Sequence, residues 1–271
     1  MKLGMIGCGK MGEAILAGLL RSGTVRAGDV RVCDKVPGRL EHLERTHGVG
    51  GVTDPRAAVA GADVVVVAVK PQDLDATAEG FADAVTARHL VVSIAAGKRL
   101  ETICALFPAA RVVRVMPNLP ATVAMGMSAF CCADAVTESD KELVLSMLEA
   151  FGKQVELPEE QFDAFTALAG SGPAFVARLV QAMAEGAVAL GMERDRALAA
   201  ARQTFAGTAA LLLNGTLDED GLVAAVSSPG GTTVAGRAVL EASDLGAVLA
   251  ATLEAAARRG AELAQEARRS R

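Results

Sequence analysis

Through about Leu157, short runs of β-branched residues alternate with stretches rich in Ala and Leu. The run Val64-Val65-Val66-Val67 is apolar on both alternating faces, as expected of a parallel strand that helices cover on both sides. This alternation is typical of βαβ units, and it predicts a doubly wound α/β sheet. The expected strands are Lys2–Ile6, Val30–Cys33, Val64–Val69, Leu90–Ile94 and Arg111–Met116.

After Pro158 the strand pattern stops, and apolar residues recur at helical spacing, as at Phe175, Leu179 and Met183. Glycine- and serine-containing breaks divide this part into about five predicted helices. We therefore expect two domains, a dinucleotide-binding Rossmann domain over residues 1–158 and a helical domain over residues 159–271. The Ala-rich helices and their apolar composition favour self-association of the second domain as a dimer.

The cysteine content indicates a reducing compartment. The five cysteines are an odd number, and they lack the paired spacing of a disulfide framework or a zinc site. We expect no metal site. The apolar N-terminal stretch is broken by Gly7, Gly9, Lys10 and Glu13, so we expect neither a signal sequence nor a membrane span, and predict a cytoplasmic protein.

The charge and aromatic content disfavour nucleic acid as a partner. The formal net charge is -5, only 3% of the residues are aromatic, and Trp and Tyr are absent. Such a chain has little with which to attract a phosphate backbone or to stack bases.

A glycine-rich segment follows the first expected strand and leads into a predicted helix. It reads Gly7-Cys8-Gly9-Lys10-Met11-Gly12, which is G-x-G-x-x-G in the context that a dinucleotide site requires. Gly7 permits the tight turn, Gly9 lets a pyrophosphate approach the backbone, and Gly12 lets helix and strand pack closely. The helix N-terminus adds free N–H donors. We predict that all six residues bind the coenzyme.

The second strand ends at Cys33-Asp34-Lys35, the position where dinucleotide domains select their coenzyme. Asp34 lies somewhat farther from Gly7 than the ~20 residues of the usual fingerprint. Its carboxylate can accept a hydrogen bond from a ribose 2′-hydroxyl, which favours NAD. Lys35, with Arg39 one helical turn on, can instead neutralise a 2′-phosphate. The sequence leaves NADH and NADPH as alternatives.

Three further segments end strands at the edge where open α/β sheets bind ligands. We predict coenzyme contacts from Ala68, Val69, Lys70 and Pro71, from Ala95, Ala96 and Gly97, and from Asn118. For Lys70 the alternative is a solvated lysine before a turn, and for Asn118 it is a local Asx turn.

Two glycine-containing segments open helices in the second half. Gly170-Ser171-Gly172-Pro173 carries residues typical of a helix start. In Ser227-Ser228-Pro229-Gly230-Gly231-Thr232-Thr233, the glycines let several N–H groups converge into an anion-binding nest, and the hydroxyls of Ser228, Thr232 and Thr233 lie beside it. This turn can hold a small carboxylate without any arginine.

The sequence shows no grouping of Ser, His and Asp typical of a catalytic triad. The histidines, His42, His47 and His89, lie away from the motifs, and we interpret them as surface residues. The chemistry must then come from the coenzyme, which favours hydride transfer.

Taken together, these segments resemble the pyrroline-5-carboxylate reductase family, in order and spacing over almost the whole chain. The resemblance rests on the G-x-G-x-x-G segment, Ala68-Val69-Lys70-Pro71, Ala95-Ala96-Gly97, Arg114-Val115-Met116-Pro117-Asn118, Gly170-Ser171-Gly172-Pro173-Ala174 and Ser227-Ser228-Pro229-Gly230-Gly231-Thr232-Thr233. The last segment is the most specific, because related reductases share the first domain but not this turn.

The resemblance implies a Rossmann-type doubly wound sheet followed by an all-helical C-terminal domain, as in 6-phosphogluconate-dehydrogenase-like proteins. It implies reduction of 1-pyrroline-5-carboxylate to L-proline with NADPH or NADH, by a dimer or a ring of dimers. By the same resemblance, Ser228, Gly230, Gly231, Thr232 and Thr233 bind the substrate. The backbone N–H groups of Gly231, Thr232 and Thr233 receive the carboxylate, and the Thr233 hydroxyl hydrogen-bonds to the imine nitrogen as the catalytic group.

Two alternatives remain open. A related imine or β-hydroxyacid reductase would share the first domain, but β-hydroxyacid dehydrogenases use a lysine on the first long helix after it. Phe175 to Met183 contains Arg178 and no lysine. The other alternative is a dinucleotide-binding sensor without turnover.

Overall fold

The computed structural model describes residues 1–269, with side chains described through residue 263. The chain divides into two compact units. Among the described residues, the first is Met1–Gly170 together with residues 256–269, and the second is Ser171–Ala255. The domain boundary that the sequence predicts, between residues 158 and 159, stays a prediction.

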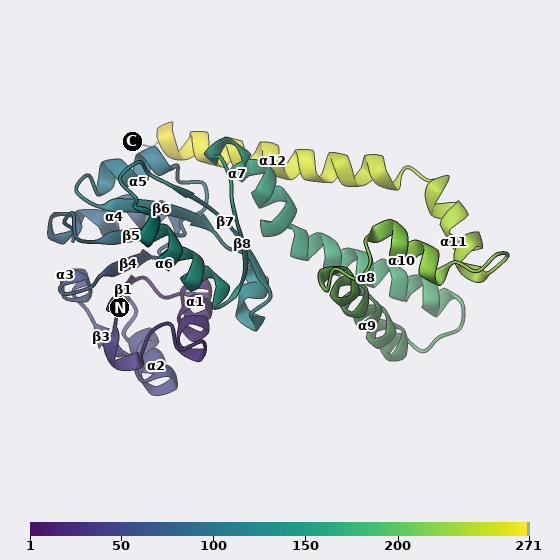
Figure 1. The fold of residues 1–271 in the computed structure, drawn as a ribbon, viewed down its shortest axis with the longest axis horizontal. Coiled ribbons are helices and arrows are strands. Elements are labelled where there is room, and N and C mark those ends of the chain that lie inside the picture. Colours follow the sequence, from purple (N-terminus) through teal and green to yellow (C-terminus); the bar gives the residue numbers. More distant parts are fainter. Residues whose placement is uncertain (270–271) are drawn as a thin grey trace. The chain divides into compact units, whose positions relative to one another are not determined.

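The first unit is built on an eight-stranded sheet with the order β3-β2-β1-β4-β5-β6-β7-β8 (Figure 1). All neighbouring strands are parallel except β6 and β7, which are antiparallel. Strand order reverses between β1 and β4, which creates the crevice where such sheets bind ligands. The strands are β1 Leu3–Ile6, β2 Val30–Cys33, β3 Gly50–Val52, β4 Val64–Val67, β5 Leu90–Ser93, β6 Arg111–Met116, β7 Gly126–Cys132 and β8 Gly152–Glu156.

The alternating faces of the parallel strands feed two separate apolar cores. Val64 and Val66 of β4 point into one core, and Val65 and Val67 point into the other. Helices α1, α2 and α6 cover the first face, and α3, α4 and α5 cover the second. The doubly wound sheet that the valine run predicts is confirmed. The helices are α1 Lys10–Arg21, α2 Pro37–His47, α3 Pro55–Val59, α4 Leu74–Glu79, α5 Leu100–Leu106, α6 Glu138–Glu149 and α7 Phe162–Phe165.

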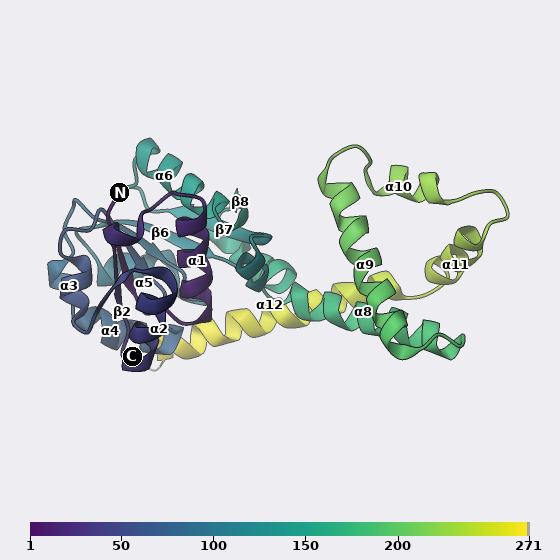
Figure 2. The ribbon, with the colours of Figure 1, turned by 90° about the horizontal axis from the view of Figure 1, so that it is seen from below.

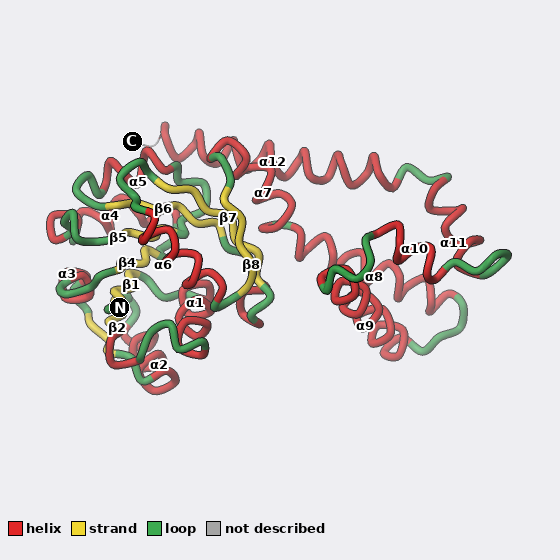
Figure 3. Tube along the Cα trace, viewed as in Figure 1, coloured by secondary structure: helices red, strands yellow, loops and turns green. Residues whose placement is uncertain are grey.

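The second unit consists of helices and loops, as Figure 3 shows. Helices α8 and α9 lie side by side (Figure 2) and pack through small residues. Ala184, Ala197 and Ala201 are buried in this contact. These are the buried apolar residues within 171–255, so this unit has little core of its own. The helices are α8 Gly172–Ala189, α9 Arg194–Leu213, α10 Glu219–Val226, α11 Thr232–Glu241 and the first part of α12 Leu245–Arg269, whose residues from Ala256 belong to the first unit.

Within the part of the chain that the structure describes, no helix is long and apolar enough to cross a membrane. No group of three or more His, Cys, Asp or Glu side chains is arranged to hold a metal ion among these residues. The five cysteines are free thiols.

Candidate functional site

Strand register brings the coenzyme segments of the sequence to one edge of the sheet. Ile6, the last residue of β1, pairs with Cys33 on one side and with Val67 on the other. The residues that follow these strands therefore meet. Together with residues after β3 and in α4, they line a cleft of about 1000 Å³, counting the part open to solvent. The lining residues are Ile6, Gly7, Cys8, Gly9, Cys33, Asp34, Lys35, Val36, Thr53, Pro55, Ala68, Val69, Lys70, Asp73 and Thr77.

The glycines have the spatial roles that a dinucleotide loop needs. Gly7 has φ +76° and lies against Val69. Gly12 packs close to the Gly7 carbonyl and Ala68. A Cβ added at Gly9, by contrast, would have no other atom within 4 Å. Helix α1 begins directly afterwards without a side-chain cap. Its first N–H groups are thus available to a pyrophosphate, and the loop fits a bound dinucleotide.

Asp34 is fixed by the backbone on both of its carboxylate oxygens. Oδ2 accepts from the Cys8 N–H at 2.9 Å, and Oδ1 accepts from the Val36 N–H at 3.0 Å. An ionised carboxylate has about four acceptor positions, so each oxygen can still accept another hydrogen bond. Its neighbour Lys35 instead forms an ion pair with Asp73, at 3.2 Å.

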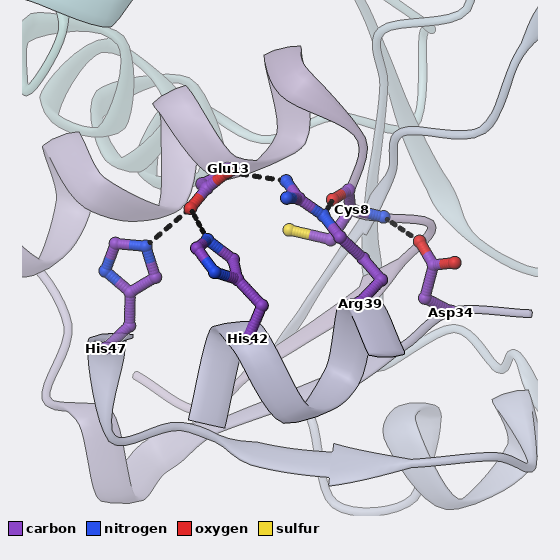
Figure 4. Close-up of polar contacts among 6 residues, drawn as sticks. All are labelled: Cys8, Glu13, Asp34, Arg39, His42 and His47. Carbon is purple, nitrogen blue, oxygen red and sulfur yellow. Dashed lines mark hydrogen bonds and ion pairs between the residues drawn. The ribbon is translucent and has the colours of Figure 1, made fainter. Parts of the chain in front are cut away.

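Behind the glycine loop, Glu13 gathers three basic side chains (Figure 4). Its Oε2 accepts from Arg39 Nη2 at 2.6 Å, and its Oε1 contacts His42 Nε2 at 2.9 Å and His47 Nε2 at 3.1 Å. Burial alone would raise the pKa of Glu13, but these hydrogen bonds outweigh it and hold the pKa at about 2. Arg39 also donates through Nε to the Cys8 carbonyl at 2.6 Å.

The interpretation of the histidines as surface residues is wrong for His89 and His47, whereas the side chain of His42 is 39% exposed. His89 is only 1% exposed and accepts the Thr86 N–H through Nδ1. The side chain of His47 is 14% exposed, and His42 is bonded to the same carboxylate. The tertiary fold brings His42 and His47 to Glu13, which lies one residue after the glycine motif.

The remaining predicted coenzyme residues differ in their surroundings. Lys70 is exposed and lines the cleft, whereas Ala95 is buried in the core on the α3, α4 and α5 face. Asn118 is 8% exposed, and its carboxamide joins two other segments: Nδ2 donates to the Ala169 carbonyl and Oδ1 accepts the Met127 N–H, each at 2.9 Å. A coenzyme contact from Asn118 stays a prediction beside this structural role.

Among the residues that the structure describes, the turn before α11 leaves two backbone N–H groups free at the start of the helix. Gly230 has φ +69°, and Gly231 occupies the N-cap position without a side-chain cap. The Gly231 N–H donates to the Ser228 carbonyl at 2.9 Å. Within the described chain the N–H groups of Thr232 and Thr233 have no acceptor, as is usual for a first helical turn. These two N–H groups are therefore available to an anion.

Ser227 was not predicted as a site residue. Its hydroxyl oxygen is buried and has no hydrogen-bond partner among the described residues. A buried polar atom without a partner is costly, so the hydroxyl is suited to meet a ligand or a second chain. The only signal in the sequence is its place beside Ser228.

The thiol of Cys8, in the glycine loop, is not a nucleophile. Burial is the main cause that raises its pKa, to about 12, so the thiol stays protonated at neutral pH.

Comparisons with known proteins agree with this arrangement. Residues 159–263 match the family model described as pyrroline-5-carboxylate reductase dimerisation, and residues 2–97 match the one described as NADP oxidoreductase coenzyme F420-dependent. A pyrroline-5-carboxylate reductase of Methanosarcina acetivorans is 38% identical over 266 residues, covering 98% of each chain.

Solved structures show the same fold. A pyrroline-5-carboxylate reductase from Coxiella burnetii superposes with a TM-score of 0.93 at 32% identity, covering 97% of this chain and 98% of its own. The Plasmodium falciparum pyrroline carboxylate reductase, solved with NADP bound, gives a TM-score of 0.83 at 23% identity and covers 97% and 98% of the two chains.

Proposed function

The chain belongs to the pyrroline-5-carboxylate reductase family, and from this premise we propose that it reduces 1-pyrroline-5-carboxylate to L-proline with NADH or NADPH, the last step of proline biosynthesis. The observation that carries the proposal is that one chain contains both a complete dinucleotide loop and an uncapped, glycine-bent helix start. The first suits a coenzyme, and the second suits a small carboxylate.

In the proposed enzyme, the glycine loop binds the pyrophosphate. N–H groups at the start of α1 face it, and Gly9 leaves room for its approach. Asp34 and Lys35 lie at the adenosine side, and Ala68, Val69 and Lys70 line the neighbouring strand end. The reduced nicotinamide supplies the hydride.

The substrate carboxylate binds at the turn that contains Gly230. The free N–H groups of Thr232 and Thr233 receive it, and the positive end of the α11 dipole favours its charge. The positive φ of Gly230 holds the turn in the required shape. Ser227 and Ser228 supply hydroxyl groups to the same turn.

Thr233 positions the ring nitrogen of the substrate. Reduction adds a hydride to the imine carbon, converts the C=N bond to C–N, and leaves the nitrogen with one proton from solvent. An iminium accepts hydride far better than a neutral imine, and a threonine hydroxyl is too weak an acid to protonate the nitrogen unaided. The proton therefore arrives with the substrate or through water, and the Thr233 hydroxyl orients the nitrogen.

The second unit needs a partner. Large apolar side chains on it are strongly exposed, with Leu190 at 89%, Leu213 at 72% and Val239 at 71%. Such residues become buried when helical units of two copies pack together. We assign residues 159–271 to dimerisation and substrate binding, and residues 1–158 to coenzyme binding.

We propose a cytoplasmic location, and the thiols support it. Cys8, Cys33 and Cys131 are buried and free, and free thiols persist in a reducing compartment. Oxidised disulfides between them in the native protein would contradict this location.

The experiment that tests the reaction compares the native chain with Thr233→Val and Thr233→Ser. We expect Thr233→Val to lower kcat by about 10- to 100-fold, the effect of losing one hydrogen bond to a charged group, and Thr233→Ser to restore most of it. Coenzyme affinity should not change. Full activity in Thr233→Val would remove Thr233 from the mechanism.

A further inference from the structure

At the adenosine end of the cleft, the carboxylate of Asp34 has no cationic partner among the described residues. The nearby cations Arg39 and Lys35 are each bound to another carboxylate. Both oxygens of Asp34 accept backbone N–H groups, and no lysine or arginine contacts it among the described residues. In a dinucleotide fold, a carboxylate at the end of the second strand accepts from a ribose 2′-hydroxyl, whereas a 2′-phosphate needs a basic group there.

Arg39 is the strongest candidate to neutralise a 2′-phosphate, and it is held behind the glycine loop. Its Nη2 is bonded to Glu13 and its Nε to the Cys8 carbonyl, both at 2.6 Å. The side chains of Arg39 and Glu13 are only 24% and 25% exposed. Arg39 does not line the cleft, although Cys8 does. Moving Arg39 to a phosphate would break both bonds and leave Glu13 without its arginine partner.

Two other nearby cations form exposed ion pairs. Lys35 pairs with Asp73, with the two side chains 79% and 37% exposed, so Lys35 can leave Asp73 at little cost and is the cation beside Asp34 that a 2′-phosphate would have to recruit. Arg56 pairs with Asp83, and it does not line the cleft. Lys70 lies beyond the end of β4, one strand farther from Asp34 than the β1 loop that faces the pyrophosphate.

We infer that this cleft selects NADH over NADPH, with Asp34 binding the ribose 2′-hydroxyl and Glu13 holding Arg39 away from the position of a 2′-phosphate. Asp34 repels the phosphate directly, and Glu13 acts through Arg39 as a positioning residue. The inference rests on the proposed coenzyme site, but the selection is a property of binding and does not depend on turnover.

The test measures binding of NADH and of NADPH separately to the full-length native protein, by calorimetry without substrate. We expect NADH to bind at least about tenfold more tightly, the ratio that 1.4 kcal/mol produces. Asp34→Ser should reduce this ratio by about tenfold or more. Equal or tighter binding of NADPH by the native protein would overturn the inference.

Two further variants separate the roles of the acidic residues. Glu13→Gln should move the ratio toward NADPH several-fold, because it releases Arg39, and Asp73→Asn should move it less, because the Lys35 pair is exposed. The matched control is Asp29→Asn, which removes the same charge before the start of β2, at the opposite edge of the sheet. An equal change of the NADH-to-NADPH affinity ratio in the control would show that net charge alone sets the ratio, which would contradict the roles assigned to Asp34 and Glu13.

Failure of the proposed reaction gives a different result. If NADH binds preferentially and neither coenzyme is oxidised when 1-pyrroline-5-carboxylate is added, the reductase proposal is overturned and the selection stands. If both coenzymes are oxidised with equal kcat/KM and bind equally, the reaction stands and the selection is overturned.

Discussion

Gly7 lies so close to Val69 that a Cβ added to Gly7 would come within 2.6 Å of Val69 Cγ1. The contact joins the loop after β1 to the segment after β4, on the two sides of the crevice. Gly9, two residues on, has open space above it and φ -66°. The two glycines of one motif are therefore required for different reasons.

We predict that Gly9→Ala leaves the melting temperature within about 2 °C of the native value and weakens NADH binding by about tenfold or more, because the methyl group occupies the approach of the pyrophosphate. Gly7→Ala should lower stability as well, by at least about 1–2 kcal/mol, because φ is positive and the methyl overlaps Val69. Thermal unfolding and calorimetry check both. Unchanged NADH binding by Gly9→Ala would show that the loop does not bind the coenzyme as proposed.

Gly230→Ala should weaken binding of L-proline, the product, in the presence of oxidised coenzyme. The left-handed backbone at Gly230 costs a residue with a Cβ about 1–2 kcal/mol, so we expect a loss of about tenfold in affinity. Gly28→Ala is the control, because Gly28 has no positive φ and no atom within 4 Å of an added Cβ. Equal proline affinities for the native protein and Gly230→Ala would exclude a role for the turn's shape.

A substitution at Asn118 tests whether its carboxamide stabilises the fold or binds the coenzyme. We predict that Asn118→Leu lowers the free energy of unfolding by about 1–3 kcal/mol, because the Met127 N–H loses its acceptor. Gln161→Leu, at an exposed carboxamide, should change it by less than about 0.5 kcal/mol. Urea unfolding measures both. If Asn118→Leu weakens coenzyme binding and leaves stability unchanged, the carboxamide acts on the coenzyme instead.

His89 should make stability depend on pH. Burial is the main cause that lowers its pKa from 6.5, so the folded state holds His89 neutral where the unfolded chain binds a proton. Stability is therefore fully present above about pH 6.5 and falls as the pH drops below it, by at most about 1.4 kcal/mol per pH unit.

The comparison uses His89→Asn, whose side-chain oxygen can replace Nδ1 as acceptor for the Thr86 N–H. Unfolding at pH 7.5 and 5.5 should show a smaller loss at low pH in the variant than in the native protein. The same loss in both would assign the pH dependence to other groups.

The sheet could be predicted from the sequence where each strand has its own pattern. The valines of β4 divide between two cores, and that division is visible as an apolar run on both faces. β3 was missed because it is three residues with two glycines, and β8 because polar residues dominate it. β7 was missed because it pairs antiparallel with β6 after a short connection, which the βαβ rhythm does not predict.

The candidate site also has one part that the sequence predicts and another that depends on tertiary packing. Contiguous segments such as the glycine loop and the turn before α11 were recognisable, because one stretch of chain supplies their donors. The contacts of Glu13 with His42 and His47 depend on how α1 packs beside α2, so no local pattern indicates them. The sequence also does not show which cations are already paired. Arg39 lies five residues after Asp34, but only the tertiary structure shows that Glu13 binds it.

The proposed function depends on hydride transfer from a nicotinamide coenzyme to a cyclic imino acid. The most direct measurement supplies NADH carrying two deuterium atoms at the reactive carbon, together with 1-pyrroline-5-carboxylate, and analyses the product by mass spectrometry and NMR. We expect L-proline with one deuterium, on the ring carbon that neighbours nitrogen and lacks the carboxylate. Proline without deuterium, or coenzyme that stays reduced, would contradict this transfer.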